Sequence, residues 1–474
     1  MNATTFSRFW TVKRYSWFLG LVLLVFVGIS VQYTAKIQDD KRDNRSAFLR
    51  WRGQILDLDA GYNIYHKHTY PNPPIMALVL RPFVALPPML GALTWFFVKV
   101  GMVFLIFRWV FFLVEDPDVP IPPWAKVLTI VLSMRPILGD LTHGNVNLFI
   151  MFLVVGALYC FRRGRDYTSG LLLGFAIACK ITPALFLPYF AWKRGWKVLA
   201  GCGIGLVLFL FVVPSVWLGP SRNARLLNHW VDQMVVPYVI EGRVTTEHQN
   251  QSLPGLTYRM LSDGPSFSVY TDGIYVPTEY HNIANVNHSA LKLFLKVFGV
   301  GFLGLMVWSC RTPITDRKSW RLAAEYGFIL IGMLILSERT WKHHCVSWII
   351  PFAVMIYYLH LSSLKRSESQ PTTNTPTQYR SYVIVSLFVV VALVATTSTT
   401  IYGPFGSRMA KLAQVYGAYV WAHMILIASL VVLLWESHQT RPPETSNQDY
   451  MPQRSASTQL EPQRQLVATC SAND

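Results

Sequence analysis

The stretch from Leu171 to Trp192, LLLGFAIACKITPALFLPYFAW, decides how the chain is threaded through a membrane. It is apolar enough for one crossing, yet basic residues flank both of its ends, and such flanks are typical of the cytoplasmic side. One crossing cannot place both flanks on the same side. Lys180 and Pro183 interrupt the stretch at its middle; proline breaks a helix, and a lysine at membrane depth is costly. We therefore predict a hairpin of two half-helices, with Lys180 near its apex and facing a water-filled cavity.

The composition extends this interpretation to the whole chain. Of 474 residues, 52% are hydrophobic and only 14% are charged, whereas soluble domains carry about 25% charged residues. The charges cluster in short blocks between apolar stretches, most of which reach the roughly 20 residues that cross a bilayer. A large soluble protein is excluded because buried core helices rarely run this long without a polar face. We predict an all-α fold, a polytopic transmembrane helical bundle without a large soluble domain.

Basic residues before the first apolar run, Ser16 to Tyr33, predict a cytoplasmic N-terminus. Residues 35–88 are then extracytoplasmic, and the hairpin places residues 219–289 on the same side. Both are loops of a membrane domain that covers residues 1–435. The polar tail 436–474 is expected to be cytoplasmic and disordered. Later spans are expected at Leu90–Val114, Lys126–Leu138 (followed by an outward turn, Gly139–Asn145), a span ending at Phe161, Val198–Leu218, Leu291–Trp308, Phe328–Leu336 with flanks, Trp348–Leu361, Tyr382–Thr399 and Val415–Leu434.

The net charge, the cysteines and one glycine-rich run argue against nucleic-acid, metal and nucleotide binding. The net charge of +17 is explained by cytoplasmic loops, so no nucleic-acid partner is expected. The six cysteines show no metal-ligand spacing. The run from Gly201 to Gly205 lies inside an apolar span and indicates helix packing rather than nucleotide binding. Because no nucleotide-binding motif is visible, a lipid-carried donor is favoured.

Four polar groups should meet on the outer side. The first outer loop holds aspartates, any of which could act as a general base, although a solvated loop is the ordinary alternative. Lys180 has a phosphate as its natural partner, with snorkelling to the interface as the alternative. The segment His248–Ser252 suits sugar hydroxyls, and Arg259 suits a phosphate, with an ordinary polar loop as the alternative. The last group is Ser337–His344, whose adjacent histidines point about 100° apart on a helix, which favours phosphate contact over metal binding.

Short motifs in a fixed order carry a family resemblance. They are Gly61-Tyr62-Asn63-Ile64-Tyr65, Tyr70-Pro71-Asn72-Pro73-Pro74, Gly144-Asn145-Val146-Asn147, Lys180-Ile181-Thr182-Pro183, Asn250-Gln251-Ser252-Leu253 and Ser337 to His344. On these motifs the chain resembles glycosyltransferase family 87, a group of polyprenyl-phosphate-sugar-dependent transferases of the GT-C class. The resemblance implies a GT-C type helical bundle and a catalytic base in the first outer loop. Asp43 is the match, and Asp40 and Asp57 stay open because the residues after Asp43 depart from the family pattern.

The resemblance maps the lysine of the Lys-x-x-Pro motif to Lys180 and the histidine pair to His343 and His344, whereas the family often has Gln where Asn145 stands. Together with the polar groups described above, the expected substrate-binding residues are Lys180, His343, His344, Asn250, Ser252, Arg259, Asn145 and Tyr65. No cofactor and no metal are expected, because cationic side chains can offset the charge of a leaving phosphate.

The expected function is transfer of a hexose, with mannose the first candidate, from a polyprenyl-phosphate-sugar donor to a lipid or glycan acceptor. The reaction would invert the anomeric carbon and take place on the extracytoplasmic face of the cell membrane, in contact with membrane lipids. A lipid or solute transporter is the alternative, although it would predict internal repeats that are not evident. A non-catalytic scaffold would leave Lys180 without a reason.

Overall fold

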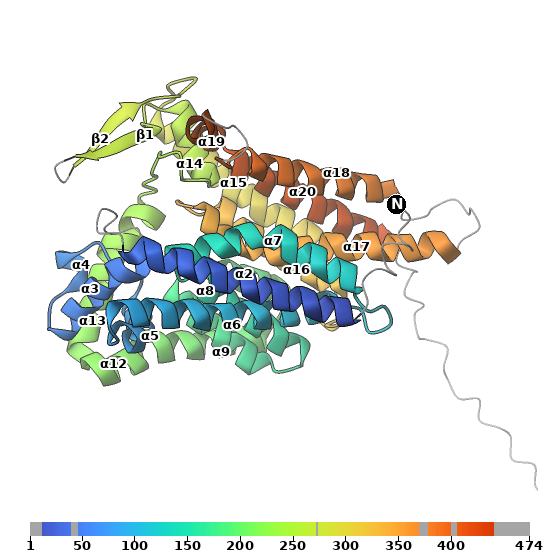
Figure 1. The fold of residues 1–474 in the computed structure, drawn as a ribbon, viewed down its shortest axis with the longest axis horizontal. Coiled ribbons are helices and arrows are strands. Elements are labelled where there is room, and N and C mark those ends of the chain that lie inside the picture. Colours follow the sequence, from blue (N-terminus) through green and yellow to red (C-terminus); the bar gives the residue numbers. More distant parts are fainter. Residues whose placement is uncertain (1–11, 39–45, 272–273, 369–377, 400–404, 440–474) are drawn as a thin grey trace, which may run out of the picture.

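The computed structural model describes residues 12–38, 46–271, 274–368, 378–399 and 405–439 (Figure 1). Long helices lie side by side and form the body of the molecule, so the predicted all-α helical bundle is confirmed. Six helical stretches among the described residues are long and apolar enough to cross a membrane: Lys13–Gln38, Pro88–Val114, Trp196–Leu218, His288–Ser309, Lys342–Leu364 and Ala418–Gln439.

The bundle is built from consecutive helices of both halves of the chain. The first half contributes α2 (Val12–Gln38), α5 (Pro74–Val84), α6 (Pro88–Val114), α7 (Pro123–His143), α8 (Asn147–Arg162), α9 (Asp166–Cys179), η2 (Thr182–Leu185), α10 (Phe186–Trp192), α11 (Trp196–Leu206), η3 (Val207–Val212) and α12 (Val213–Leu218). The second half contributes α15 (His288–Ser309), α16 (Trp320–Ile335), η5 (Lys342–Trp348), α17 (Ile349–Glu368), α18 (Gln378–Ala395) and α20 (Ala418–Gln439).

A cap of shorter elements covers one end of the bundle (Figure 1). It contains α3 (Ala47–Asp59), α4 (Ile64–Lys67), α13 (Pro220–Trp230), η4 (Val231–Ile240), α14 (Leu253–Leu261), β1 (Phe267–Thr271), β2 (Ile274–Glu279) and α19 (Gly406–Val415). The two strands pair antiparallel, with Val269 opposite Val276. Arg408 of α19 donates to both carboxylate oxygens of Glu279 and so ties the hairpin to the last quarter of the chain.

The helix breaks at Lys180 and the chain then returns, as the sequence predicts. Lys180 has extended backbone angles, φ −156° and ψ 126°, because the ring of Pro183 clashes with a helical carbonyl four residues earlier, at Cys179. Phe190 on α10 contacts Phe161, just before α9 begins, with ring centroids 5.5 Å apart. The far end of α10 therefore lies beside the start of α9, and Lys180 stands at the turning point.

Glycines let α9 approach α11 closely. A Cβ atom added at Gly170 would lie 2.1 Å from the carbonyl oxygen of Val198, and one at Gly174 would lie 2.6 Å from that of Cys202. Gly201 and Gly205 on α11 face the backbone of α9 in the same way. The helix-packing interpretation of the Gly201–Gly205 run is thus confirmed, since small residues allow two helix backbones to touch.

The structure corrects the expected end of the third span. The helix α7 does not end near Leu138 but continues through the predicted turn to His143, and Gly144 ends it with φ 63°. Asp140 can stay inside the bundle because Lys99 of α6 pairs with it at 2.9 Å, and both side chains are fully buried. At the other end of the chain, α20 continues to Gln439, and the predicted disordered tail beyond it lies outside the described residues.

Candidate active site

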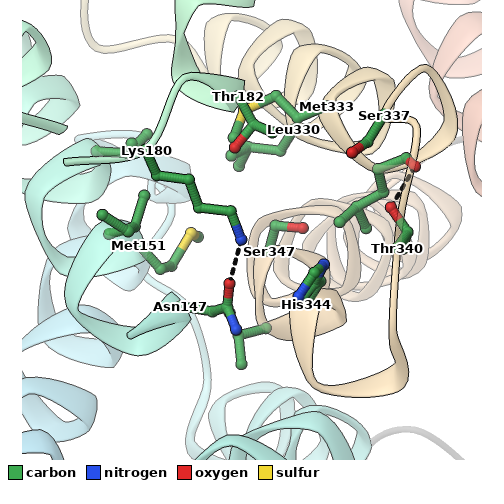
Figure 2. Close-up of a pocket in the computed structure, with 14 residues that line it drawn as sticks. Asn147, Met151, Lys180, Thr182, Leu330, Met333, Ser337, Thr340, His344 and Ser347 are labelled. Atoms are coloured by element: carbon green, nitrogen blue, oxygen red, sulfur yellow. Dashed lines mark hydrogen bonds between the residues drawn. The ribbon is translucent and has the colours of Figure 1, made fainter. Parts of the chain in front are cut away.

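A cavity of about 40 Å³ lies where α8, the break after α9, α16 and η5 meet (Figure 2). Its polar lining consists of Asn147, Lys180, Thr182, Ser337, Thr340, His344 and Ser347. Its apolar lining consists of Ile150, Met151, Val154, Leu330, Met333, Leu334 and Val346. A cavity lined by both polar and apolar side chains suits a ligand with a charged head and a hydrocarbon tail.

Lys180 points into this cavity from the turning point of the hairpin (Figure 2). Its Nζ donates to Asn147 Oδ1 at 2.6 Å. An ammonium carries three N–H donors, and within the described residues only this one is used, so two donors remain for a ligand. The predicted wet, cavity-facing position of Lys180 agrees with its partly exposed side chain.

The two histidines of the Ser337–His344 segment occupy different places. His344 lines the cavity, and its Nδ1 accepts from the backbone N–H of Trp341 at 3.4 Å, so Nε2 carries the proton in the neutral ring. His343 is buried behind it and does not line the cavity. The phosphate contact expected of both histidines is therefore geometrically open to His344 alone.

Ser347 adds an unpaired hydroxyl to the cavity wall. Its Oγ is buried and has no hydrogen-bond partner among the described residues. Leaving a buried hydroxyl unpaired costs about 1–3 kcal/mol. A bound ligand with an acceptor atom would remove that cost, and Ser347 lies beside His344 and Lys180 in Figure 2.

Arg259, Asn250 and Ser252 hold the cap rather than lining the cavity. The guanidinium of Arg259 is fully buried and donates to five backbone carbonyls, those of Thr246, Glu247, Asn250, Gln414 and Val415. Asn250 Oδ1 accepts from the hydroxyl of Ser252 at 2.9 Å and from the backbone N–H of Thr340 at 3.0 Å. The predicted sugar and phosphate contacts of these residues have no support in this geometry, because their polar atoms are engaged within the cap.

Two further predicted residues are also engaged elsewhere. The hydroxyl of Tyr65 is buried and donates to the carbonyl of Asn72 at 2.8 Å. Asp57 lies 2.6 Å from His68 Nε2 and 3.0 Å from Lys67 Nζ, and these contacts hold the pKa of Asp57 below its usual value. Neither Tyr65 nor Asp57 lines the cavity.

The other two candidate bases, Asp40 and Asp43, lie outside the described residues. The chain resumes at Ser46, whose Oγ lies 2.8 Å from the hydroxyl of Tyr33. A Cβ atom added at Gly144 would lie 2.9 Å from Ser46 Oγ. The first described residue after Asp43 thus packs against the turn that carries Asn145.

A comparison with protein families identifies the chain. The model of glycosyltransferase family 87 matches residues 70–337, more than half of the sequence. The chain belongs to glycosyltransferase family 87. The family expected from the motifs is confirmed, and the GT-C class that it implied stands with this assignment.

Several curated proteins are similar to this family 87 protein. A polyprenol-phosphate-mannose-dependent alpha-(1-2)-phosphatidylinositol mannoside mannosyltransferase of Mycobacterium tuberculosis is 31% identical over 238 residues, covering 49% of this chain and 47% of the relative. Its counterpart in Mycolicibacterium smegmatis is 26% identical over 237 residues, covering 49% and 46%. The chain therefore spans about half the length of these curated relatives. Among solved structures, ArnT from Cupriavidus metallidurans bound to undecaprenyl phosphate matches at TM-score 0.34 and 13% identity, covering 90% of this chain and 81% of ArnT.

Sequence reasoning overlooked part of this family 87 site. Asn147 stands in the quoted Gly144–Asn147 motif, but only Asn145 was selected from it. Lys99 and Asp140, the buried pair beneath Asn147, were not considered. The available signal for Lys99 was the same as for Lys180, namely an ammonium inside an apolar stretch.

Proposed function

We propose that this family 87 protein is a membrane glycosyltransferase that moves a hexose from a polyprenyl-phosphate-sugar donor to a lipid or glycan acceptor on the extracytoplasmic face. One observation carries the proposal: Lys180, which uses one of its three donors among the described residues, points into a cavity lined by both polar and apolar side chains. An anionic head with a long hydrocarbon tail suits both kinds of lining. Mannose is the first candidate sugar, because the printed names of the relatives specify polyprenol-phosphate-mannose.

The proposed placement of the donor follows from the lining. Lys180 would hold the phosphate, with the hydroxyl of Ser347 and Nε2–H of His344 as further donors. The polyprenyl chain would extend along the apolar lining between α8 and α16. Charge-assisted hydrogen bonds of this kind are roughly twice as strong as neutral ones.

The proposed reaction is a single displacement. A carboxylate takes the proton from an acceptor hydroxyl while that oxygen forms a bond to the anomeric carbon. The bond from the anomeric carbon to the phosphate oxygen breaks, and its electron pair leaves with polyprenyl phosphate. Lys180 offsets the charge that grows on the phosphate, which lowers the barrier. Attack opposite the leaving group inverts the anomeric carbon.

Asp43 is the proposed base, with Asp40 as the second candidate. Only two residues separate Asp43 from Ser46, which packs against the turn beside the site. Asp57 is the weaker candidate because Lys67 and His68 already engage its carboxylate. An aspartate paired in this way is a poorer proton acceptor, since its negative charge is stabilised.

The test uses the full chain in proteoliposomes with radiolabelled polyprenyl-phosphate-mannose and a bacterial lipid extract as acceptor. We expect Asp43→Asn and Lys180→Ala to lower sugar transfer at least a hundredfold. Asp57→Asn and Lys411→Ala, an exposed lysine of the cap, should stay near wild type. Equal activity of Asp43→Asn and wild type would overturn the proposed base. Movement of the intact donor across the vesicle without sugar transfer would indicate the transporter alternative.

The acceptor and the sugar need a separate measurement. Mass spectrometry of lipids and glycans from cells that lack the protein should show loss of a single hexose from one species. Loss of a pentose or of no sugar would correct the proposed substrate. Restoring the gene with Lys180→Ala should fail to restore the missing species.

A further inference from the structure

A buried ion pair is joined through Asn147 to Lys180, the residue proposed to bind the phosphate. Lys99 Nζ on α6 donates to Asp140 Oδ1 on α7 at 2.9 Å, and both side chains are fully buried. The same ammonium donates to the carbonyls of Asp140 at 3.0 Å and Asn145 at 2.9 Å. All three of its donors are therefore used, and Lys99 has none left for a ligand.

The second oxygen of Asp140 binds the residue that holds Lys180. Asp140 Oδ2 accepts from the backbone N–H of Asn147 and from Asn147 Nδ2, both at 3.1 Å. A carboxylate can only accept hydrogen bonds. The NH₂ group of Asn147 must therefore face Asp140, and its Oδ1 must face the opposite way.

Asn147 Oδ1 therefore faces the cavity, where it accepts from Lys180 Nζ at 2.6 Å (Figure 2). The order Lys99, Asp140, Asn147, Lys180 is thus a chain in which each donor meets an acceptor. Reversing the Asn147 amide would place its NH₂ group against the ammonium of Lys180. The direction of the whole chain is set by the carboxylate of Asp140.

We propose that Asp140 is a positioning residue, which directs the Asn147 oxygen so that the ammonium of Lys180 is held at the polar end of the cavity. This inference rests on the proposed function, in which Lys180 binds the phosphate of the donor. Stability alone is a weak reason for the pair, since replacing a buried ion pair by well-packed apolar residues is often neutral or stabilising. What an apolar pair cannot supply is an acceptor that orients Asn147.

The variant Asp140→Asn tests whether the carboxylate of Asp140 sets the orientation of the Asn147 amide, because asparagine has almost the same shape as aspartate. Lys99 requires an acceptor, so the oxygen of the introduced amide turns toward Lys99 and its NH₂ group turns toward Asn147. Donor then faces donor, unless the Asn147 amide reverses and presents its NH₂ group to Lys180. We expect the affinity for undecaprenyl phosphate, measured on the full chain in nanodiscs, to fall about tenfold or more. Losses of this size are typical when a residue that orients a metal ligand through a hydrogen bond is replaced.

The double variant Lys99→Met with Asp140→Asn should restore most of that affinity. Without the ammonium, the oxygen of the introduced amide is free to accept from Asn147, and the Asn147 oxygen again faces Lys180. Asn147→Ala should lower the affinity to a similar extent, although the Lys99–Asp140 pair remains. Asn223→Ala, which removes a buried asparagine of α13 outside the site, is the matched control and should leave the affinity within twofold of wild type.

A double-mutant cycle separates positioning from a general structural effect. If Asp140 acts through Lys180, then Asp140→Asn should cause no further loss of kcat/KM in a Lys180→Ala background. Full additivity of the two substitutions would overturn the inference, as would a double variant with Lys99→Met that binds no better than Asp140→Asn alone. Failure of the wild-type protein to bind undecaprenyl phosphate would overturn the proposed function and this inference with it. Normal wild-type binding with unaffected Asp140 and Asn147 variants would overturn only the inference.

Discussion

Asn145 Nδ2 lies 2.9 Å from His343 Nε2 and joins the turn after α7 to the helix η5. Asn145 Oδ1 accepts from the backbone N–H of Val146 at 2.7 Å, so the amide nitrogen is the donor toward His343. His343 Nε2 is therefore an acceptor, which requires a neutral ring with its proton on Nδ1. This contact places His343 as a support for its neighbour His344, which lines the cavity.

His343→Ala should lower kcat/KM for sugar transfer by about tenfold to a hundredfold, because η5 loses its tie to the Asn145 turn. His343→Gln supplies an amide oxygen that can accept from Asn145 and should recover most of the activity. Steady-state kinetics in proteoliposomes measure both. Equal losses in the two variants would show that the accepted hydrogen bond is not what matters.

Close packing of α9 on α11 can be tested with a matched pair of glycines. Gly174→Ala would place a Cβ atom 2.6 Å from the carbonyl of Cys202, whereas a Cβ atom at Gly203 meets nothing within 4 Å. We expect Gly174→Ala to destabilise the protein by about 1–3 kcal/mol. Gly203→Ala should be neutral or slightly stabilising, since alanine favours a helix. Thermal unfolding in detergent compares them, and equal melting temperatures would contradict the observed helix contact.

Arg259→Met should lower the unfolding free energy by at least about 3 kcal/mol. The substitution removes hydrogen bonds from a buried charged donor and leaves several buried carbonyls unpaired. The control is Arg408→Met, whose exposed ion pair with Glu279 should contribute little to stability because solvent screens it. If the control were the more damaging change, the structural role assigned to Arg259 would be wrong.

Stability should fall as the pH is lowered, with His248 as one cause. Burial, helped by Lys411, Arg259 and Lys342, lowers the pKa of His248 in the cap to about 4. The unfolded chain binds this proton below about pH 6.5, whereas the folded chain does not until about pH 4. The stabilisation is therefore complete above pH 6.5 and is lost between pH 6.5 and pH 4.

His248→Phe removes this proton site and keeps a ring against Phe267, which lies 4.7 Å from the His248 ring. The drop in melting temperature between pH 7 and pH 5 should be smaller in this variant than in wild type. An unchanged drop would assign the acid sensitivity to other groups.

The side of the membrane on which the cap lies can be read by cysteine labelling. In a cysteine-free background, Glu241→Cys marks the cap and Lys318→Cys marks the loop before α16; both positions are exposed. An impermeant maleimide added to intact cells should label the first and spare the second. The reverse pattern would place the cavity toward the cytoplasm and remove the proposed outer-leaflet route for the donor.

Local chemistry made some of these features predictable from the sequence. Pro183 disfavours the helix before it through a local clash and a missing N–H donor, and basic flanks on both sides of Leu171–Trp192 argue against a single crossing. The hairpin and the cavity-facing Lys180 follow from these facts alone. Glycine spacing likewise predicts close helix packing without naming the partner helix, which proved to be α9.

The roles of the remaining polar residues depended on partners that are distant in sequence. Arg259 donates to Val415, 156 residues away, and Lys99 pairs with Asp140, 41 residues away. An arginine in an outer loop is equally compatible with a phosphate and with backbone carbonyls, so its chemistry alone could not assign it. The membrane helices, the break at Lys180 and the family motifs were determined by the sequence, because each depends on neighbouring residues. Tertiary contacts alone decided which polar groups face the cavity and which are hydrogen-bonded to other parts of the protein. The reason is that hydrogen-bond donors bind whichever acceptors folding brings near them.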